Sequence, residues 1–294
     1  MTAPFGNVLT AMITPFDGDG NVDHGRVWEL ARFLVENGSD GLVVGGTTGE
    51  SPTLSFDEKV ALFRAVAEAV GDKAVVVAGT GTYDTRESIE LTKHAEGAGC
   101  HAVMAVTPYY SRPSQEGLIA HFTAIEGASS LPVLLYNIPS RTGCRIEVDT
   151  LARLGENPGI VAVKDAVGDL GFTTATRLAA GDDLAIYSGD DILTLPIISV
   201  GGVGVVSVAA HLAGKQIKEM VTASLDGNWE KARALHMALA PLNKALFLEP
   251  NPQPVKAALG ALWEPVGDPR LPLIPASDET LRAVREGLEA SLTP

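Results

Sequence analysis

Short apolar runs rich in valine and isoleucine recur eight times along this chain, with segments of helical spacing between them. The runs are continuous and do not alternate, as is typical of parallel strands covered on both faces. Eight strand–helix repeats favour an α/β fold of the closed (β/α)8 (TIM) barrel type over an open doubly wound sheet. The predicted strands are Val8–Pro15, Gly41–Gly45, Ala74–Gly79, Ala102–Thr107, Val133–Asn137, Ile160–Lys164, Ala185–Ser188 and Gly204–Val208.

Helices are predicted between these strands. Asp23–Asn37 and Phe56–Val70 carry apolar residues at helical spacing, and Ser114–Ile125 is a further candidate. Asp84, with Glu87 three residues later, matches a capping box and predicts the start of a helix.

The strand pattern ends after His211, and only helical patterns follow. The chain has 294 residues, more than the roughly 250 that a barrel typically uses. We therefore expect residues 1–225 to form the barrel that carries the active site and residues 226–294 to form a C-terminal helical segment. The helices predicted after His211 are Leu212–Ala223, Trp229–Leu248, Pro252–Leu262 and Asp278–Ser291.

Charge and composition exclude several classes of partner. The net charge of −14 repels phosphate backbones and anionic lipid, so neither nucleic acid nor a membrane surface is expected as a partner. The apolar runs are much shorter than the ~18 residues that a membrane-spanning helix needs. No secretory signal pattern is recognised, and two cysteines make no disulfide framework, so a cytoplasmic location is expected.

Lys164 is the most informative residue for chemistry. Active sites of such barrels lie at the C-terminal ends of the strands, and Lys164 is the only one of nine lysines placed in a predicted strand. Burial disfavours an ammonium ion, and a neutral amine can condense with a carbonyl group. An ion pair with Asp165 or Asp190 is the structural alternative.

Other polar residues follow neighbouring strands. Tyr136 can transfer protons to a covalent adduct, although a core tyrosine is the alternative. Thr47 and Thr48 lie between glycines in a loop whose hydroxyl and N–H groups can hold a carboxylate. That loop lacks the Gly-Lys-Ser/Thr ending of a phosphate-binding loop. Arg141 can bind a carboxylate through two parallel hydrogen bonds.

No metal site is expected. The six histidines do not cluster with carboxylates at ligand spacing. Asp190 and Asp191 stand side by side after a predicted strand, but we expect them to cap the helix that follows.

Together these residues lie in motifs that resemble the dihydrodipicolinate synthase / N-acetylneuraminate lyase family over nearly the whole chain, and the synthase branch most closely. Each motif alone is weak, whereas the set is highly specific. The motifs are Gly45–Ser51, Val106–Tyr110, Arg112–Gly117, Tyr136–Gly143, Val163–Asp165, Ser188–Asp191 and Phe247–Lys256.

The resemblance implies a cofactor-independent lyase of the class I aldolase type in the diaminopimelate route to lysine. Lys164 would hold pyruvate as a Schiff base, which condenses with L-aspartate 4-semialdehyde to give 4-hydroxy-tetrahydrodipicolinate. Tyr136 would be the general acid/base, linked through Thr48 to Tyr110. In relatives the partner subunit supplies this last tyrosine, so the resemblance implies a homo-oligomer, a tetramer built as a dimer of dimers.

The resemblance also implies the substrate-binding residues. Thr47 would hold the pyruvate carboxylate, and Arg141 the carboxylate of the second substrate. Gly189 and Val206 would line the pocket. Asn251 belongs to the last motif but receives no catalytic role.

Two alternatives differ in substrate or in class. Arg141 favours the synthase over sialic acid lyases, but Asp165 replaces a common glutamate, so a sister pyruvate-dependent aldolase or a keto-deoxy-sugar acid dehydratase remains the alternative. A catalytically silent barrel is disfavoured because Lys164, Tyr136 and Thr48 are all present.

The resemblance further implies an effector site for lysine at a dimer interface. A cationic residue in that site, Lys59, would repel a cationic effector, so weak or absent lysine inhibition is expected. The corresponding positions are Ser51, Phe56, Lys59, Tyr83, Glu87 and Tyr109.

Overall fold

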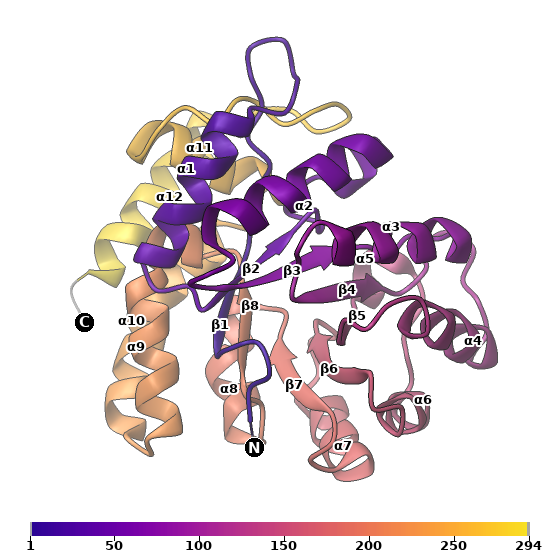
Figure 1. Ribbon diagram of the computed structural model, residues 1–294. Coiled ribbons are helices and arrows are strands. Elements are labelled where there is room, and N and C mark those ends of the chain that lie inside the picture. Colours follow the sequence, from indigo (N-terminus) through magenta and orange to yellow (C-terminus); the bar gives the residue numbers. More distant parts are fainter. Residues whose placement is uncertain (1, 293–294) are drawn as a thin grey trace.

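The computed structural model describes residues 2–292, in which eight parallel strands close into a barrel (Figure 1). The strands pair in sequence order, and β1 closes the barrel by pairing with both β2 and β8. The predicted (β/α)8 barrel is therefore confirmed. The strands are β1 Val8–Ala11, β2 Gly41–Val44, β3 Val75–Gly79, β4 Ala102–Val106, β5 Val133–Asn137, β6 Ile160–Asp165, β7 Ala185–Ser188 and β8 Gly204–Ser207.

Helices connect the strands and cover the outside of the barrel (Figure 1). Asp84 caps α3 as predicted, but its carboxylate accepts from Arg86 N rather than from Glu87 N. A complete capping box stands instead at the start of α2, between Ser55 and Glu58. The helices are α1 His24–Glu36, η1 Ser51–Thr53, α2 Phe56–Val70, α3 Thr85–Gly97, α4 Gln115–Glu126, α5 Pro139–Thr142, α6 Val148–Gly155, α7 Leu170–Ala180, η2 Asp191–Leu193, α8 Thr194–Ser199, α9 Ala210–Leu225, α10 Trp229–Ala245, α11 Gln253–Leu262 and α12 Asp278–Ser291.

Alternation along each strand divides the core into two parts. One set of strand side chains, including Leu9, Val43 and Leu134, fills the barrel interior. The intervening side chains, such as Val8 and Leu42, pack with apolar residues of the helices. Both faces of the strands are therefore apolar, which accounts for the continuous apolar runs in the sequence.

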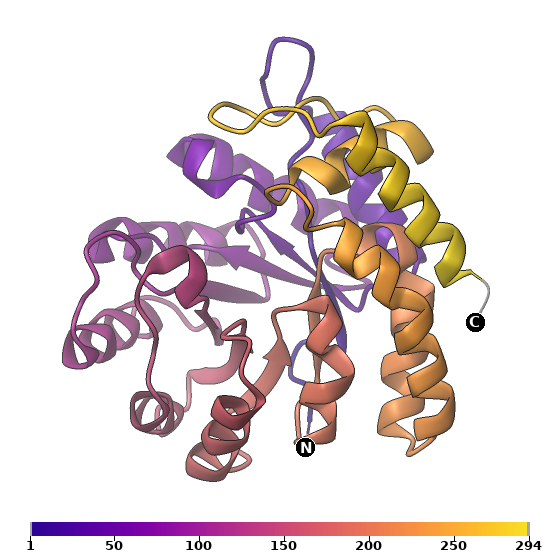
Figure 2. The same ribbon diagram turned by 180° about the vertical axis from the view of Figure 1, so that it is seen from behind.

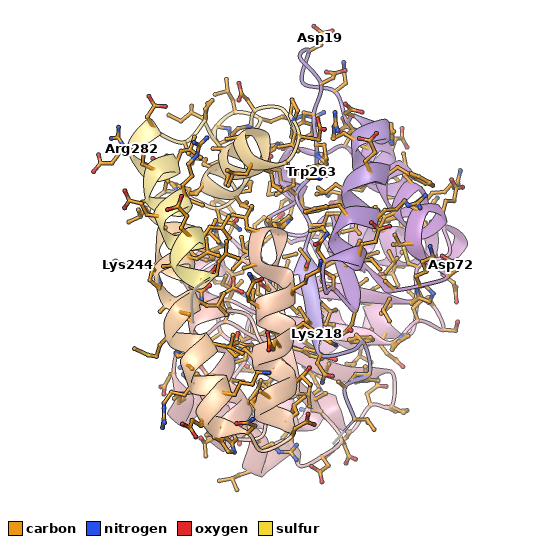
Figure 3. The ribbon with its side chains drawn as sticks, turned by 90° about the vertical axis from the view of Figure 1, so that its left-hand side faces the viewer. Asp19, Asp72, Lys218, Lys244, Trp263 and Arg282 are labelled. Atoms are coloured by element: carbon orange, nitrogen blue, oxygen red, sulfur yellow. The ribbon has the colours of Figure 1, made fainter. Side chains whose placement is uncertain are left out.

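The helices α10, α11 and α12 follow the barrel without a separating linker. α10 packs against both α9 and α12 and lies on the side of the barrel away from α4 and α6 (Figures 1 and 2). Trp263, which follows α11, packs against Phe33 of α1 with the rings tilted and their centroids 5.0 Å apart, and the Arg26 guanidinium lies 5.6 Å from the centroid of the Trp263 ring. Figure 3 shows Trp263 where these helices meet α1. The C-terminal helices are thus held against the N-terminal part of the chain.

No helix among residues 2–292 is both long and apolar enough to cross a membrane.

His211 joins the first and last strands of the barrel through its side chain. Its Nε2 accepts a hydrogen bond from Ile13 N at 3.1 Å, and its Nδ1 donates to Val208 O at 2.8 Å. The first bond explains why β1 ends at Ala11 and not at the predicted Pro15, because Ile13 N bonds to the ring and not to a strand. The first contact requires the neutral ring, because Nε2 can accept only when it carries no proton, and burial lowers the pKa of His211 to about 4.

Because His211 is buried, we expect the folded protein to lose stability at mildly acidic pH. Because the folded-state pKa of about 4 lies below the ordinary value of 6.5, the unfolded chain binds the extra proton between these values. The stabilisation is complete above pH 6.5 and is lost as pH falls toward 4. A shift of this size corresponds to a free energy on the order of 3 kcal/mol.

Urea unfolding of the wild type and of His211→Gln across this pH range tests the prediction. The variant should unfold more easily at neutral pH, and its free energy of unfolding should depend less on pH. The exposed His24→Gln is the matched control. Equal pH slopes for the wild type and His211→Gln would contradict the assignment.

Candidate active site

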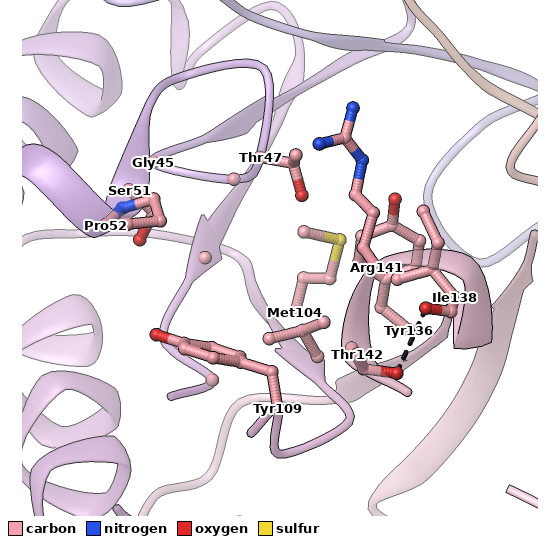
Figure 4. Close-up of a pocket in the computed structure, with 14 residues that line it drawn as sticks. Gly45, Thr47, Ser51, Pro52, Met104, Tyr109, Tyr136, Ile138, Arg141 and Thr142 are labelled. Atoms are coloured by element: carbon pink, nitrogen blue, oxygen red, sulfur yellow. Dashed lines mark hydrogen bonds between the residues drawn. The ribbon is translucent and has the colours of Figure 1, made fainter. Parts of the chain in front are cut away.

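A pocket of about 200 Å³ opens among the loops that follow β2, β4 and β5, at the C-terminal end of the barrel (Figure 4). Its lining includes Thr47, Tyr109, Tyr136 and Arg141. A second hollow of about 810 Å³ shares Arg141 with the first and extends to Gly189. Arg141 is exposed and stands where the two spaces meet, which suits a residue that receives an incoming substrate.

Three lysines among residues 2–292 are nearly fully buried: Lys59, Lys164 and Lys256. Lys256 forms an ion pair with Glu50 at 2.8 Å, and Lys59 lies 3.9 Å from Glu87. Lys164, 5% exposed, has no ion pair with a carboxylate in this part of the chain. Lys164 is thus the one of these three buried lysines whose amine is not engaged by a carboxylate, and an amine of this kind can act as a nucleophile.

The carboxylates that could have paired with Lys164 bind elsewhere. Asp165 accepts from Val167 N at 3.0 Å and from the Thr173 hydroxyl at 2.6 Å. Asp190 caps η2 by accepting from Ile192 N, as predicted. Asp191 does not act as a helix cap beside it: its carboxylate accepts from Val208 N, from Ala209 N and from the Ser207 hydroxyl, and so holds the turn after β8.

Burial shifts these acids in one direction. It raises the pKa of Asp165, Asp190 and Asp191.

Among residues 2–292, no group of three or more histidine, cysteine or acidic side chains is arranged to hold a metal ion.

Tyr136 and Lys164 are register partners on the adjacent strands β5 and β6. Lys164 Nζ lies 4.0 Å from the centroid of the Tyr136 ring. Gly189 leaves room beside them, since a Cβ there would lie 3.1 Å from Lys164 Cγ and 2.7 Å from Ala166 Cβ. Val206 is buried in the same interior cluster as Tyr136. Parallel pairing therefore places the Lys164 amine beside the ring of Tyr136, which lines the pocket.

The β2 loop provides the opposite wall. Thr47 is half-buried and lines the pocket with Arg141 (Figure 4). Thr48 is buried, and its Oγ1 accepts a hydrogen bond from Asn251 Nδ2 at 2.9 Å. Within residues 2–292 no hydrogen bond joins Thr48 to Tyr136 or Tyr110. Tyr110 is 96% exposed and has a left-handed backbone with φ of 68°.

A buried ionic network holds the end of this loop. Glu50 accepts from Lys256 Nζ and from Arg270 N, both at 2.8 Å. Arg270 also binds Glu58, and its hydrogen bond lowers the pKa of Glu58 to about 2. The sequence alone does not predict this network. Glu50 and Lys256 both occur in the recognised motifs, but nothing in the sequence pairs two residues so far apart.

Five of the six predicted effector-site residues lie near one another. Tyr83 and Tyr109 meet edge to face at 5.2 Å, and Glu87 is close enough to raise the pKa of Tyr109 further, although burial raises it most. Lys59 approaches Glu87, and Ser51 lines the pocket with Tyr109. Phe56 instead makes its aromatic contact with His94.

Comparison with known proteins connects this geometry to a family. A 4-hydroxy-tetrahydrodipicolinate synthase of Desulforamulus reducens is 54% identical over 97% of this chain and 96% of its own length. The lysine-bound dihydrodipicolinate synthase of Cyanidioschyzon merolae matches with a TM-score of 0.95 and 46% identity, covering 99% of both chains.

The Acinetobacter baumannii dihydrodipicolinate synthase complexed with pyruvate matches with a TM-score of 0.94 and 37% identity, covering 99% of this chain and 100% of that one. The model of the dihydrodipicolinate synthetase family matches residues 4–291. The chain therefore belongs to the dihydrodipicolinate synthetase family.

Proposed function

We propose that Lys164 binds pyruvate covalently as an imine and that the resulting enamine attacks L-aspartate 4-semialdehyde. The overall reaction is that of a 4-hydroxy-tetrahydrodipicolinate synthase, a lyase of lysine biosynthesis. The observation that carries the assignment to Lys164 is its burial without a carboxylate partner, beside the Tyr136 phenol.

The first half of the reaction activates pyruvate. The Lys164 amine adds to the keto carbon, and loss of water leaves a protonated imine. This cation accepts electron density, so the methyl group can lose a proton and form an enamine. Tyr136, whose ring centroid lies 4.0 Å from Lys164 Nζ, would donate and accept these protons. The hydroxyl and backbone groups of the Thr47 loop would hold the pyruvate carboxylate.

The second half forms the carbon–carbon bond. The enamine carbon attacks the aldehyde carbon, and the aldehyde oxygen takes up a proton. The amino group of the second substrate then adds to the imine carbon and displaces Lys164, which closes the ring and regenerates the free amine. Arg141, where the two hollows meet, would bind the carboxylate of the second substrate.

We assign Thr48 and Tyr110 to a proton relay that extends from Tyr136. The Tyr110 side chain is too exposed to transfer protons within its own barrel unless another subunit covers it. Its strained, left-handed backbone holds the ring outward. Both features support contribution of this side chain to the site of a partner subunit, in a dimer or a dimer of dimers.

We further propose that residues 1–225 carry the chemistry and that residues 226–294 support it. Both cysteines, buried Cys100 and half-buried Cys144, are unpaired. Free thiols are typical of a reducing compartment, so the cytoplasm is the proposed location.

A sister aldolase with another aldehyde substrate is the second candidate. The observation that favours it is Asp165 in place of glutamate, but that carboxylate is bound to Thr173 and to Val167 N and does not face a substrate. The Arg141 guanidinium favours a second substrate that bears a carboxylate. It provides a local positive charge in a chain whose net charge of −14 would otherwise repel an anion.

Replacement of the nucleophile is the direct test of the mechanism. Lys164→Ala should abolish turnover of pyruvate with L-aspartate 4-semialdehyde while the protein still folds, because the variant lacks the amine that forms the imine. Turnover is measured as loss of NADPH with excess dihydrodipicolinate reductase. Borohydride with pyruvate should add a stable adduct to the wild type and none to the variant, as read by mass spectrometry.

Two results separate the candidates. Normal turnover by Lys164→Ala would exclude the Schiff-base mechanism. Adduct formation without NADPH loss, with the reductase shown to be active, would leave Lys164 as the pyruvate residue and favour the sister aldolase.

Inhibition by lysine is predicted to be weak or absent. Lys59 lies 3.9 Å from Glu87, so it partly neutralises the carboxylate that would attract an ammonium group. Its own charge repels the effector. Burial lowers the pKa of Lys59, and Glu87 opposes that shift.

Activity in a lysine titration tests this prediction, with Lys59→His as the comparison variant. The wild type should keep most of its activity at sub-millimolar lysine, and the variant should be more sensitive. Half-maximal inhibition of the wild type at sub-millimolar lysine would contradict the prediction.

A further inference from the structure

Asn251 makes a buried contact with the proposed proton relay. Its Nδ2 donates to Thr48 Oγ1 at 2.9 Å, across 203 positions of sequence. Both side chains are almost inaccessible, at 6% exposure for Asn251 and 3% for Thr48. Asn251 Oδ1 is also buried and has no hydrogen-bond partner within residues 2–292. The contact is therefore the one polar interaction that fixes this amide.

A buried ion pair close to this hydrogen bond restrains the two segments that carry Thr48 and Asn251. Glu50, two positions after Thr48, binds Lys256 Nζ at 2.8 Å, and both charged side chains are almost completely buried. Lys256 lies in the first turns of α11, which begins two residues after Asn251. The ion pair therefore fixes the distance between the β2 loop and the start of α11, and it leaves the amide little freedom to move away from Thr48.

The direction of the hydrogen bond determines what the Thr48 proton can do. A threonine hydroxyl has one proton to donate and two lone pairs that accept. When Asn251 Nδ2 donates, it occupies one lone pair, so the Thr48 proton must point to a different acceptor. A relay through Thr48 needs this arrangement, because a hydroxyl that donated to Asn251 could not donate to a tyrosine.

The opposite orientation of the amide is less favourable. Turning the amide would direct Oδ1 at Thr48 and leave the NH2 group, with two protons, buried without an acceptor. Within residues 2–292, the observed orientation leaves Oδ1 and only one N–H of the amide without a partner, and an unpaired buried oxygen is tolerated better than an unpaired N–H. A buried donor or acceptor without a partner costs about 1–3 kcal/mol, so the observed orientation has the smaller penalty.

We propose that Asn251 is a positioning residue that orients the Thr48 hydroxyl for proton transfer, and that the C-terminal segment thereby takes part in the active site. The proposal rests on the relay role of Thr48 proposed above. Asn251 does not touch substrate in this assignment, and it acts through Thr48.

Asn251→Asp is the most selective test, because it keeps the size of the side chain and replaces the donor by an acceptor. The carboxylate would attract the Thr48 proton and withdraw it from the relay. We expect kcat to fall about 100-fold, the lower end of what general acid–base catalysis contributes. The KM for pyruvate should change little, because the Thr47 loop and Lys164 remain.

Gln253→Glu is the matched control for a new carboxylate in the same segment. Gln253 is buried near Asn251 and contacts Glu249 rather than Thr48. This variant should lose thermal stability but keep kcat. An equal loss of kcat in Gln253→Glu and Asn251→Asp would overturn the proposal, because it would assign the loss to damage of the whole segment.

A double-mutant cycle with Thr48→Val identifies the residue through which Asn251 acts. In the Thr48→Val background, Asn251→Asp should lower kcat no further. Independent, multiplying losses would overturn the role of Asn251 and leave the relay in place. Unchanged kcat in Thr48→Val alone would overturn both the relay and the positioning role. The kcat of each variant is compared at equal folded fraction, measured by circular dichroism.

Discussion

Closure of the barrel in a fixed register is the constraint on which the site depends. Because β5 and β6 pair in parallel with Tyr136 opposite Lys164, a phenol and an amine meet inside the barrel. The alternation of side chains sends both of them inward with the interior cluster. A shift of one residue in either strand would turn one of these side chains toward the helices. The chemistry of the pocket thus follows directly from strand pairing.

The C-terminal helices complete the site and do not merely extend the barrel. Buried Lys256 neutralises Glu50 at the end of the β2 loop, and Asn251 bonds to Thr48 within the same loop. Removing one partner of such a buried ion pair leaves an uncompensated charge, which typically costs about 3–5 kcal/mol. The loop that lines the pocket is therefore held by residues that lie some 200 positions later in the chain.

Much of this structure could be predicted because its signals are local. Eight apolar runs marked all eight strands, and β5 and β7 begin and end as predicted. The special status of Lys164 was also visible, because a lysine in a strand is unusual. Burial alone does not distinguish Lys164, because Lys59 and Lys256 are also buried. Lys164 differs from them because it has no carboxylate partner within residues 2–292. The capping box predicted at Asp84 is not formed, because that carboxylate accepts from Arg86 N; the complete box stands at Ser55, at the start of a different helix.

The sequence by itself determined the number and order of strands, the position of the strand lysine and the motifs of the family, since these depend on side-chain type and spacing. Only the tertiary structure decided which distant residues meet. It paired Glu50 with Lys256 and Asn251 with Thr48, ended β1 early through His211, and directed Asp191 to the turn after β8. Such contacts depend on closure of the chain in three dimensions, and hydrophobic periodicity along one dimension carries no information about them.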